Sequence, residues 1–151
     1  MSIDVAEELR RVGLRATVPR MKVLSFFLDE QQRHFTAEDV CRQVADEKLN
    51  ISFGSIYRVL QQFVEAKILR SGTLHSTKIV YELNNGQDHD HAICMSCGKI
   101  EEFYDPVFDA RQKEIGESVG FLVVGRQLVL QGYCVKCRAT APKPTDNAEG
   151  R

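Results

Sequence analysis

Four of the five cysteines fall in two pairs with the same spacing. Cys94 and Cys97 form one CxxC pair, and Cys134 and Cys137 form the other. Each pair can present two thiolates on one tight turn, and four thiolates complete a tetrahedral Zn²⁺ site. The alternative is two redox-active CxxC motifs, which two pairs in one small domain make less favourable. We therefore predict a structural zinc site, and we expect the fifth cysteine, Cys41, to be a buried core residue.

A second group of metal-binding residue types precedes the first cysteine pair. His89 and His91 flank Asp90, and on an extended segment residues i and i+2 face the same side. Imidazole and carboxylate ligands suit Fe²⁺, Mn²⁺ or Zn²⁺ without choosing between them. The alternative is a set of solvated surface histidines. The nearby carboxylates and the other candidate imidazole are Glu82, Glu101, Glu102 and His34; taken alone, His34 is more typical of a helix start.

These groups must be positioned by the rest of the chain, and residues 1–83 are predicted to form helices followed by a hairpin. Thr36 with Asp39 three residues later resembles a capping box, and apolar residues recur at i, i+3, i+4, i+7 and i+8 from Ile56. The predicted elements are a helix through Val5, Leu9 and Val12, a helix from Pro19, a helix from Thr36 with Val40, Cys41, Val44 and Leu49 inside, a helix after Ser52 or Gly54, and strands Ile68–Ser71 and Lys78–Leu83 with Gly72 in the turn.

This order of elements is that of a winged helix-turn-helix domain. The outer face of the fourth helix carries hydrogen-bonding side chains suited to phosphates and base edges in a major groove. The alternative is a solvated polar face. The residues concerned are Ser55, Tyr57, Arg58, Gln61 and Gln62.

A polar link at residues 84–90 separates this domain from a small α+β domain at 91–138. Strands are predicted at Ala92–Cys94, Ile100–Phe103 and Phe121–Tyr133, around a helix at Pro106–Val119. Residues 139–151 lack large apolar side chains, and we expect a disordered tail there.

Composition limits the possible classes of function. The chain has 151 residues, of which 43% are hydrophobic, and its formal net charge is −1. Binding of nucleic acid by overall positive charge is thus excluded, so any DNA binding must use a local patch. No apolar run approaches the ~20 residues of a membrane span, and the acidic start at Met1–Glu8 lacks the features of a secretory signal. We expect a cytoplasmic protein.

Several motifs in the same order resemble the ferric uptake regulator family, whose members are metal-dependent bacterial DNA-binding repressors. The resemblance covers roughly residues 8 to 138. The motifs are Gly13–Arg20, His34–Val40, Ser55–Leu60, Tyr81–Leu83 and His89–Phe103.

The resemblance implies a role for each candidate residue. Cys94, Cys97, Cys134 and Cys137 would hold structural Zn²⁺; His34, Glu82, His89, His91 and Glu102 would form the regulatory metal site; Arg15, Ser55, Tyr57 and Arg58 would lie at the DNA. It further implies a homodimer formed by the C-terminal domain, an AT-rich palindromic operator, and pairing across the dimer by the strand from Phe121 to Leu130.

Two choices within the family can be argued from individual residues. Glu82 and Glu102 favour an iron-type or other uptake regulator over peroxide sensors, which have Asp in place of Glu102 and commonly in place of Glu82. Many members have a further metal site matching Asp90, Asp109 and Arg126, but a guanidinium has no lone pair to offer a metal. We therefore expect Arg126 to pair with Asp90 or Asp109 in place of a metal.

The predicted function is metal-responsive repression of iron uptake genes, with Fe²⁺ as the regulatory metal and Mn²⁺ or Zn²⁺ as alternatives. Two other classes are weaker. A zinc hydrolase needs an open metal position and a helical HExxH motif, which the sequence lacks. A thiol redox switch would act through the CxxC pairs and lose DNA binding on oxidation.

Overall fold

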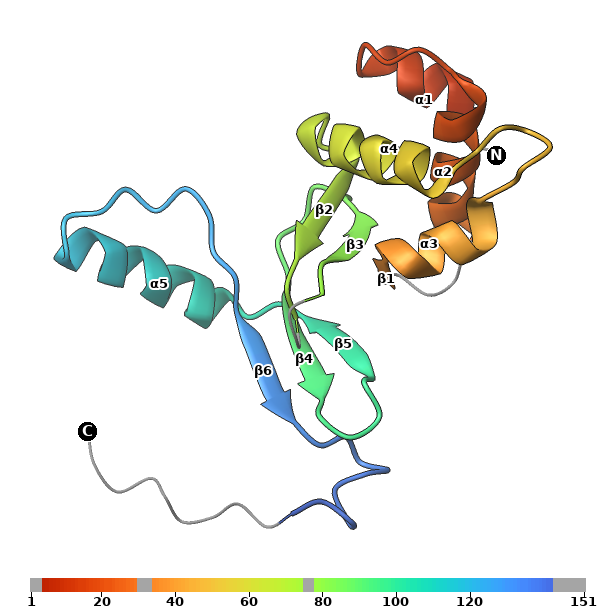
Figure 1. Ribbon diagram of the computed structural model, residues 1–151. Coiled ribbons are helices and arrows are strands. Elements are labelled where there is room, and N and C mark those ends of the chain that lie inside the picture. Colours follow the sequence, from red (N-terminus) through yellow and green to blue (C-terminus); the bar gives the residue numbers. More distant parts are fainter. Residues whose placement is uncertain (1–3, 30–33, 75–77, 143–151) are drawn as a thin grey trace. The chain divides into compact units, whose positions relative to one another are not determined.

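A computed structural model describes residues 4–29, 34–74 and 78–142 (Figure 1). The chain divides into two compact units, residues 1–87 and residues 88–151. This division falls within residues 84–90, the link predicted from the sequence. Residues 143–151 of the predicted disordered tail lie outside the described residues, and in its described part the Thr140 amide donates to the Cys137 carbonyl at 3.1 Å.

The described part of the first unit contains four helices, and three begin at side-chain caps. They are α1 (Val5–Arg11), α2 (Val18–Asp29), α3 (Ala37–Val44) and α4 (Phe53–Glu65). Asp4 caps α1 and Ser52 caps α4. The predicted capping box of α3 is confirmed: the Asp39 amide donates to the Thr36 hydroxyl at 3.2 Å, and the Thr36 amide donates to the Asp39 carboxylate at 2.9 Å. Each cap satisfies an amide that the helix leaves without a partner.

The apolar faces of these helices form one core. The apolar residues predicted for α4 are buried, apart from the half-buried Val64. Leu49 was wrongly assigned to the inner face of α3, because it lies beyond that helix and is 44% exposed. The Asp46 carboxylate accepts the amides of Lys48 and Leu49, which turns the chain. Ile51 is the residue that enters the core after this turn.

A three-stranded antiparallel sheet completes the first unit. The strands are β1 (Phe35–Thr36), β2 (Leu69–Gly72) and β3 (Val80–Leu83), in the order β1-β3-β2. The sequence did not predict β1, and Gly72 pairs with Val80 at the end of β2 instead of forming the turn. Helices followed by this hairpin make a winged helix-turn-helix unit, as predicted.

The second unit contains a mixed sheet and one helix. The strands are β4 (Asp90–Cys94), β5 (Ile100–Phe103) and β6 (Val129–Gly132), in the order β5-β4-β6. Strand β4 pairs antiparallel with β5 and parallel with β6. Helix α5 (Pro106–Ser118) begins after the N-cap Asp105 and lies in the connection between β5 and β6.

The predicted strand Phe121–Tyr133 is largely wrong, because only Val129–Gly132 forms a strand. Residues 121–127 instead return along α5 (Figure 1). The Phe121 amide donates to the Gly116 carbonyl at 2.8 Å, and Val123 packs so closely on Gly116 that a side chain there would collide with it. Within the described residues, no strand pairs with this apolar run. The sequence of the run alone could not reveal that.

The two units differ in how much apolar surface they bury. All fifteen residues of the hydrophobic core cluster belong to the first unit. In residues 88–142, Ile93 and Cys94 are the buried apolar side chains, whereas large apolar residues on α5 and in the returning segment are exposed. None of the helices described is long and apolar enough to cross a membrane.

Replacing Thr36 with Ala should destabilise the first unit by about 1 kcal/mol, the usual cost of a lost N-cap. The Thr36 hydroxyl lowers the pKa of Asp39, so this carboxylate stabilises the fold above its unfolded pKa of about 3.9. That contribution is lost as the pH falls below this value. In denaturant titrations at pH 7, the free energy of unfolding of Thr36→Ala should be lower than that of the wild type, and this difference should shrink below about pH 4. Thr36→Ser is the control. Equal free energies of unfolding for Thr36→Ala and the wild type at pH 7 would contradict the prediction.

Candidate metal centres

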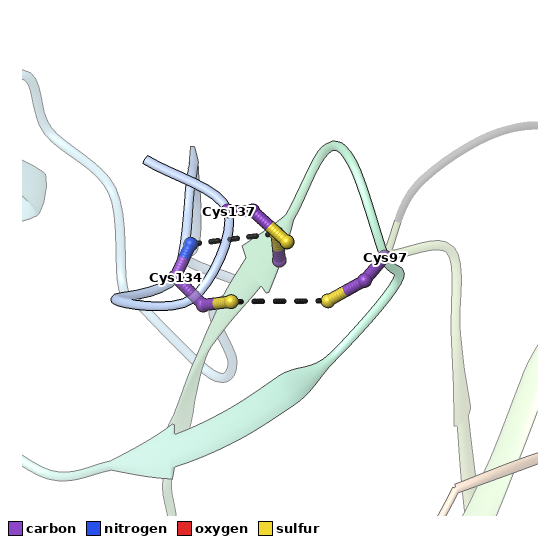
Figure 2. Close-up of side chains that lie close together, drawn as sticks. Cys97, Cys134 and Cys137 are labelled. Carbon is purple, nitrogen blue, oxygen red and sulfur yellow. Dashed lines mark hydrogen bonds between the residues drawn. The ribbon is translucent and has the colours of Figure 1, made fainter. Parts of the chain in front are cut away.

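The four paired cysteines converge at one end of the second unit. Each can offer a sulfur within 4.8 Å of the other three. Cys97 Sγ and Cys134 Sγ are 3.8 Å apart (Figure 2). Four sulfurs at about 2.3 Å from a tetrahedral zinc would be about 3.8 Å from each other. The donor set therefore fits Zn²⁺, and the ends of β4 and β6 supply the two knuckles.

Backbone amides around these sulfurs favour the thiolate form. The amides of Cys134 and Cys97 lower the pKa of the Cys94 thiol to about 6. The amide of Cys137 lowers the pKa of Cys134, whereas the hydrogen bond that the Cys137 thiol donates to the Cys134 sulfur raises the pKa of Cys137 to about 12. Thiolates are the form that ligates metals. The folded chain thus prepares part of the cluster for a cation.

In the first unit, the unpredicted strand β1 places His34 beside Glu82. Phe35 is opposite Tyr81 in the antiparallel pair β1/β3. His34, which precedes Phe35, is therefore opposite Glu82. The His34 Nε2 and Glu82 Oε2 atoms are 2.9 Å apart, and the side chains are 9% and 12% exposed. Sequence reasoning took His34 alone as a helix-start residue. Its pairing with a carboxylate on β3 is a tertiary feature.

In the second unit, the strand alternation brings three predicted ligands to one face. The rings of His89 and His91 have their centroids 4.8 Å apart. His91 is opposite Glu102 in the β4/β5 pair, and residues opposite each other in a strand pair share a face. Glu101 points to the other face and forms an ion pair with Lys99. The structure therefore selects Glu102 over Glu101 as the companion of the histidines.

The carboxylate of Asp90, which lies between the two histidines in the sequence, forms an ion pair with Arg126. The Arg126 Nη1 atom donates to both Asp90 carboxylate oxygens, at 2.8 Å and 2.7 Å. The Arg126 Nε atom is 3.6 Å from Asp109 Oδ1, and Lys113 pairs with Asp109 at 2.9 Å. The predicted pairing of Arg126 with these carboxylates is confirmed. Both carboxylates are paired with cationic side chains of the chain.

On α4, the predicted DNA-facing side chains differ in how they are held. Tyr57 and Arg58 are exposed, and the Arg58 Nε donates to the Gly54 carbonyl at 3.3 Å. Partial desolvation and Glu38 raise the pKa of Tyr57, so its phenol keeps a proton to donate. The Ser55 hydroxyl donates to the Ser52 carbonyl at 2.7 Å, within the first turn of the helix.

Arg20 is a residue whose role sequence reasoning missed. Its Nε and Nη2 atoms donate to the Gln62 side chain on α4, at 3.1 Å and 3.0 Å. Its Nη1 donates to the Arg15 carbonyl at 3.0 Å. Arg20 thus fixes the segment that carries the exposed Arg15 to α4. No local pattern indicates this link, because Arg20 and Gln62 are far apart in the sequence.

The fold and the donor sets define a metal-binding protein with a winged-helix unit, a kind of unit that binds DNA. A model of the ferric uptake regulator family matches residues 11–131. The ferric uptake regulation protein of Cupriavidus metallidurans is 43% identical over 129 residues, which cover 85% of this chain and 90% of that protein. The chain therefore belongs to the ferric uptake regulator family, a family of metal-responsive transcriptional regulators, which confirms the resemblance seen in the sequence.

Solved structures of family members share the fold. The ferric uptake regulator from Francisella tularensis with iron matches with a TM-score of 0.74 and 36% identity, over 83% of this chain and 96% of that one. The regulator from Pseudomonas aeruginosa with manganese matches with a TM-score of 0.70 and 34% identity, over 88% and 99%. The predicted fold class is confirmed by these similarities.

Replacing Cys94 with Ala should release the metal from the cysteine cluster and unfold the second unit, because few apolar side chains are buried there. Zinc content after gel filtration and amide exchange in β4 and β6 would measure both effects. Cys41→Ala is the control, since Cys41 is buried in the first unit and should leave zinc content unchanged. A folded, zinc-free Cys94→Ala protein would refute a structural metal at this cluster.

Proposed function

We propose that this chain is a cytoplasmic, metal-dependent repressor of iron uptake and homeostasis genes, and that it acts as a homodimer on an AT-rich palindromic operator. The observation that carries the proposal is that each unit of this member of the ferric uptake regulator family has a cluster of His and Glu side chains that could bind a metal, which we call a half-site. One half-site is the buried His34–Glu82 pair. The other is the face of β4 and β5 that carries His89, His91 and Glu102.

The cysteine cluster is proposed to hold structural Zn²⁺. The spacing of the sulfurs and the lowered pKa of Cys94 support this role. Four protein thiolates fill a tetrahedral site and leave no place for a substrate, which favours a structural over a catalytic metal. Zinc binding would then supply folding free energy to a unit with a small core.

The regulatory cation is proposed to be bound by both half-sites together. His34 and Glu82 belong to residues 1–87, and His89, His91 and Glu102 belong to residues 88–151. Residues that share one cation would restrict the link at 84–90 and so limit the orientations of the winged-helix units. Linkage of this kind typically changes DNA affinity by about 5–150-fold.

Fe²⁺ is the proposed regulatory metal, and Mn²⁺ or Zn²⁺ are the alternatives. Imidazole and carboxylate donors accept all three, so cellular availability decides which one binds. The similar regulator from Francisella tularensis contains iron and that from Pseudomonas aeruginosa contains manganese. Glu82 and Glu102 are the residues that favour an iron-type regulator over a peroxide sensor.

DNA contact is proposed for α4 and for the segment that carries Arg15. Tyr57 and Arg58 are exposed on the outer face of α4, and Ser55 lies in its first turn. A recognition helix uses the residues of its N-terminal part to contact base edges. Arg20, through Gln62, would hold Arg15 at a fixed distance from α4, so that both reach the same duplex.

The dimer surface is proposed to include α5 and the segment after it. Leu122 and Val124 are 89% and 92% exposed, and further apolar residues on α5 are exposed as well. A contiguous exposed apolar surface marks an interaction site. A second copy of the chain, bringing the same surface, would cover it in a symmetric dimer.

DNA binding of the zinc-loaded protein should tighten with Fe²⁺ or Mn²⁺ and weaken with a chelator, by about 5–150-fold. Fluorescence anisotropy with an AT-rich palindromic duplex under anaerobic conditions measures this. His89→Ala should remove most of the tightening and keep the zinc content. Glu101→Ala is the control, because Glu101 pairs with Lys99 on the face of β5 opposite to Glu102.

Three outcomes would contradict the proposal. Equal DNA binding under all metal conditions would mean that the half-sites do not regulate. Loss of zinc or of the fold in His89→Ala would mean that the two metal sites are not separate. Loss of binding with peroxide and recovery with a reductant, without any response to Fe²⁺ or Mn²⁺, would favour a thiol redox switch.

Tyr57→Ala should weaken operator binding by about 1–3 kcal/mol, the usual size of a specific base-edge contact. The affinity for metal in the absence of DNA should stay unchanged, because Tyr57 belongs to neither half-site. Anisotropy and a metal titration provide the two measurements. Tyr104→Ala, an exposed tyrosine of the second unit, is the matched control, and an equal loss of DNA affinity in both variants would rule out a specific contact by Tyr57.

A further inference from the structure

A buried ion pair anchors the start of β4. Asp90 is 1% exposed and Arg126 is 15% exposed. One guanidinium nitrogen of Arg126 reaches both carboxylate oxygens, and the Arg126 Nη2 atom is buried with no hydrogen-bond acceptor among the described residues. The Asp90 carboxylate is thus held in place by one side chain from a distant part of the chain.

The same guanidinium connects β4 to α5. Its Nε atom is 3.6 Å from the carboxylate of Asp109, which Lys113 also holds at 2.9 Å. The four side chains are two acids and two bases, so the cluster is neutral. Strand β4, helix α5 and the segment before β6 therefore meet at Arg126.

This anchor lies directly behind the two histidines. Side chains alternate between the faces of a strand, so Asp90 points away from the face shared by His89 and His91. The His91 amide donates to the Leu128 carbonyl at 3.2 Å, two residues after Arg126. The Asp90–Arg126 ion pair and this backbone hydrogen bond thus both hold residues 89–91 against residues 126–128.

Loss of either partner would disturb this arrangement strongly. Removal of Arg126 alone would leave a carboxylate buried without its cation, which costs several kcal/mol in comparable cases. The strand could relieve that cost only if Asp90 rotated toward water. Such a rotation would turn His89 and His91 as well, because all three residues share one short backbone segment.

We propose that Arg126 is a positioning residue for the regulatory metal site. It acts through Asp90 to hold the imidazoles of His89 and His91 on one face of β4 before a cation binds. The inference rests on the proposed regulatory role of these histidines. It adds that the chain uses an internal guanidinium, and not a bound metal, to preorganise them.

The test compares three variants of the full-length, zinc-loaded protein. Arg126→Lys keeps the charge but loses the planar guanidinium that reaches Asp90 through Nη1 and Asp109 through Nε. The double variant Asp90→Asn with Arg126→Gln removes both charges and avoids an unpaired buried carboxylate. Arg111→Gln is the control, because Arg111 forms an exposed ion pair with Glu114 on α5 and contacts neither half-site.

The first readout is the affinity for Mn²⁺, measured from the electron paramagnetic resonance signal of the free ion. Changes behind a metal ligand typically weaken binding by about 10–100-fold. We expect this loss in the double variant, a smaller loss in Arg126→Lys, and none in Arg111→Gln. Zinc content should be unchanged in all three, which a general loss of structure would not allow.

The second readout is the nitrogen-15 spectrum of the histidine rings without Mn²⁺. The signals of His89 and His91 should shift or broaden in the Arg126 variants, while the signal of His34 should stay as in the wild type. Unchanged ring signals together with wild-type Mn²⁺ affinity would overturn the proposal. If the double variant loses zinc, the same two measurements on Arg126→Lys decide the question.

Failure of the proposed function gives a different result. In that case the wild-type protein would show no Mn²⁺ binding that His89→Ala removes. The ring signals would still report whether Arg126 positions the histidines. The inference fails, and the proposed function stands, if wild-type Mn²⁺ binding depends on His89 but every Arg126 variant binds with the same affinity.

Discussion

The second unit buries very few apolar side chains, and this shortage governs how its parts are held. Ile93 and Cys94 are the buried apolar residues among residues 88–142. A unit this small cannot gain enough stability from hydrophobic burial alone. The directed interactions of this unit are the ion pair between Asp90 and Arg126 and the cluster of four cysteines at the ends of β4 and β6, which is proposed to bind Zn²⁺. The exposed apolar surface of α5 is the surface proposed to contact a second copy of the chain.

The first unit follows the opposite principle. Its described helices bury a continuous apolar core. In the same unit, Glu82 lies on β3 and pairs with His34, which directly precedes β1. Under the proposed function, the regulatory cation would restrict the link at 84–90 between a unit with a large apolar core and a unit with few buried apolar side chains.

Much of the fold was predictable because it depends on local patterns. The capping box at Thr36 and the periodic apolar residues from Ile56 fix where α3 and α4 begin and which faces they bury. The errors have local causes as well. Asp46 turns the chain, so that Ile51 and not Leu49 enters the core. An apolar run at residues 121–127 resembles a strand, but a strand forms only where a partner is available for its hydrogen bonds.

The sequence by itself determined the chemistry of the protein: two CxxC pairs, a His-Asp-His segment and the motifs of the ferric uptake regulator family. Residue types and short spacings carry that information. Only the tertiary structure decided which groups meet. Strand β1 brings His34 to Glu82, the β4/β5 register selects Glu102 over Glu101, and the fold of residues 106–128 delivers Arg126 to Asp90. These contacts join residues far apart in the chain, and their partners are set by packing and strand register, which no local pattern encodes.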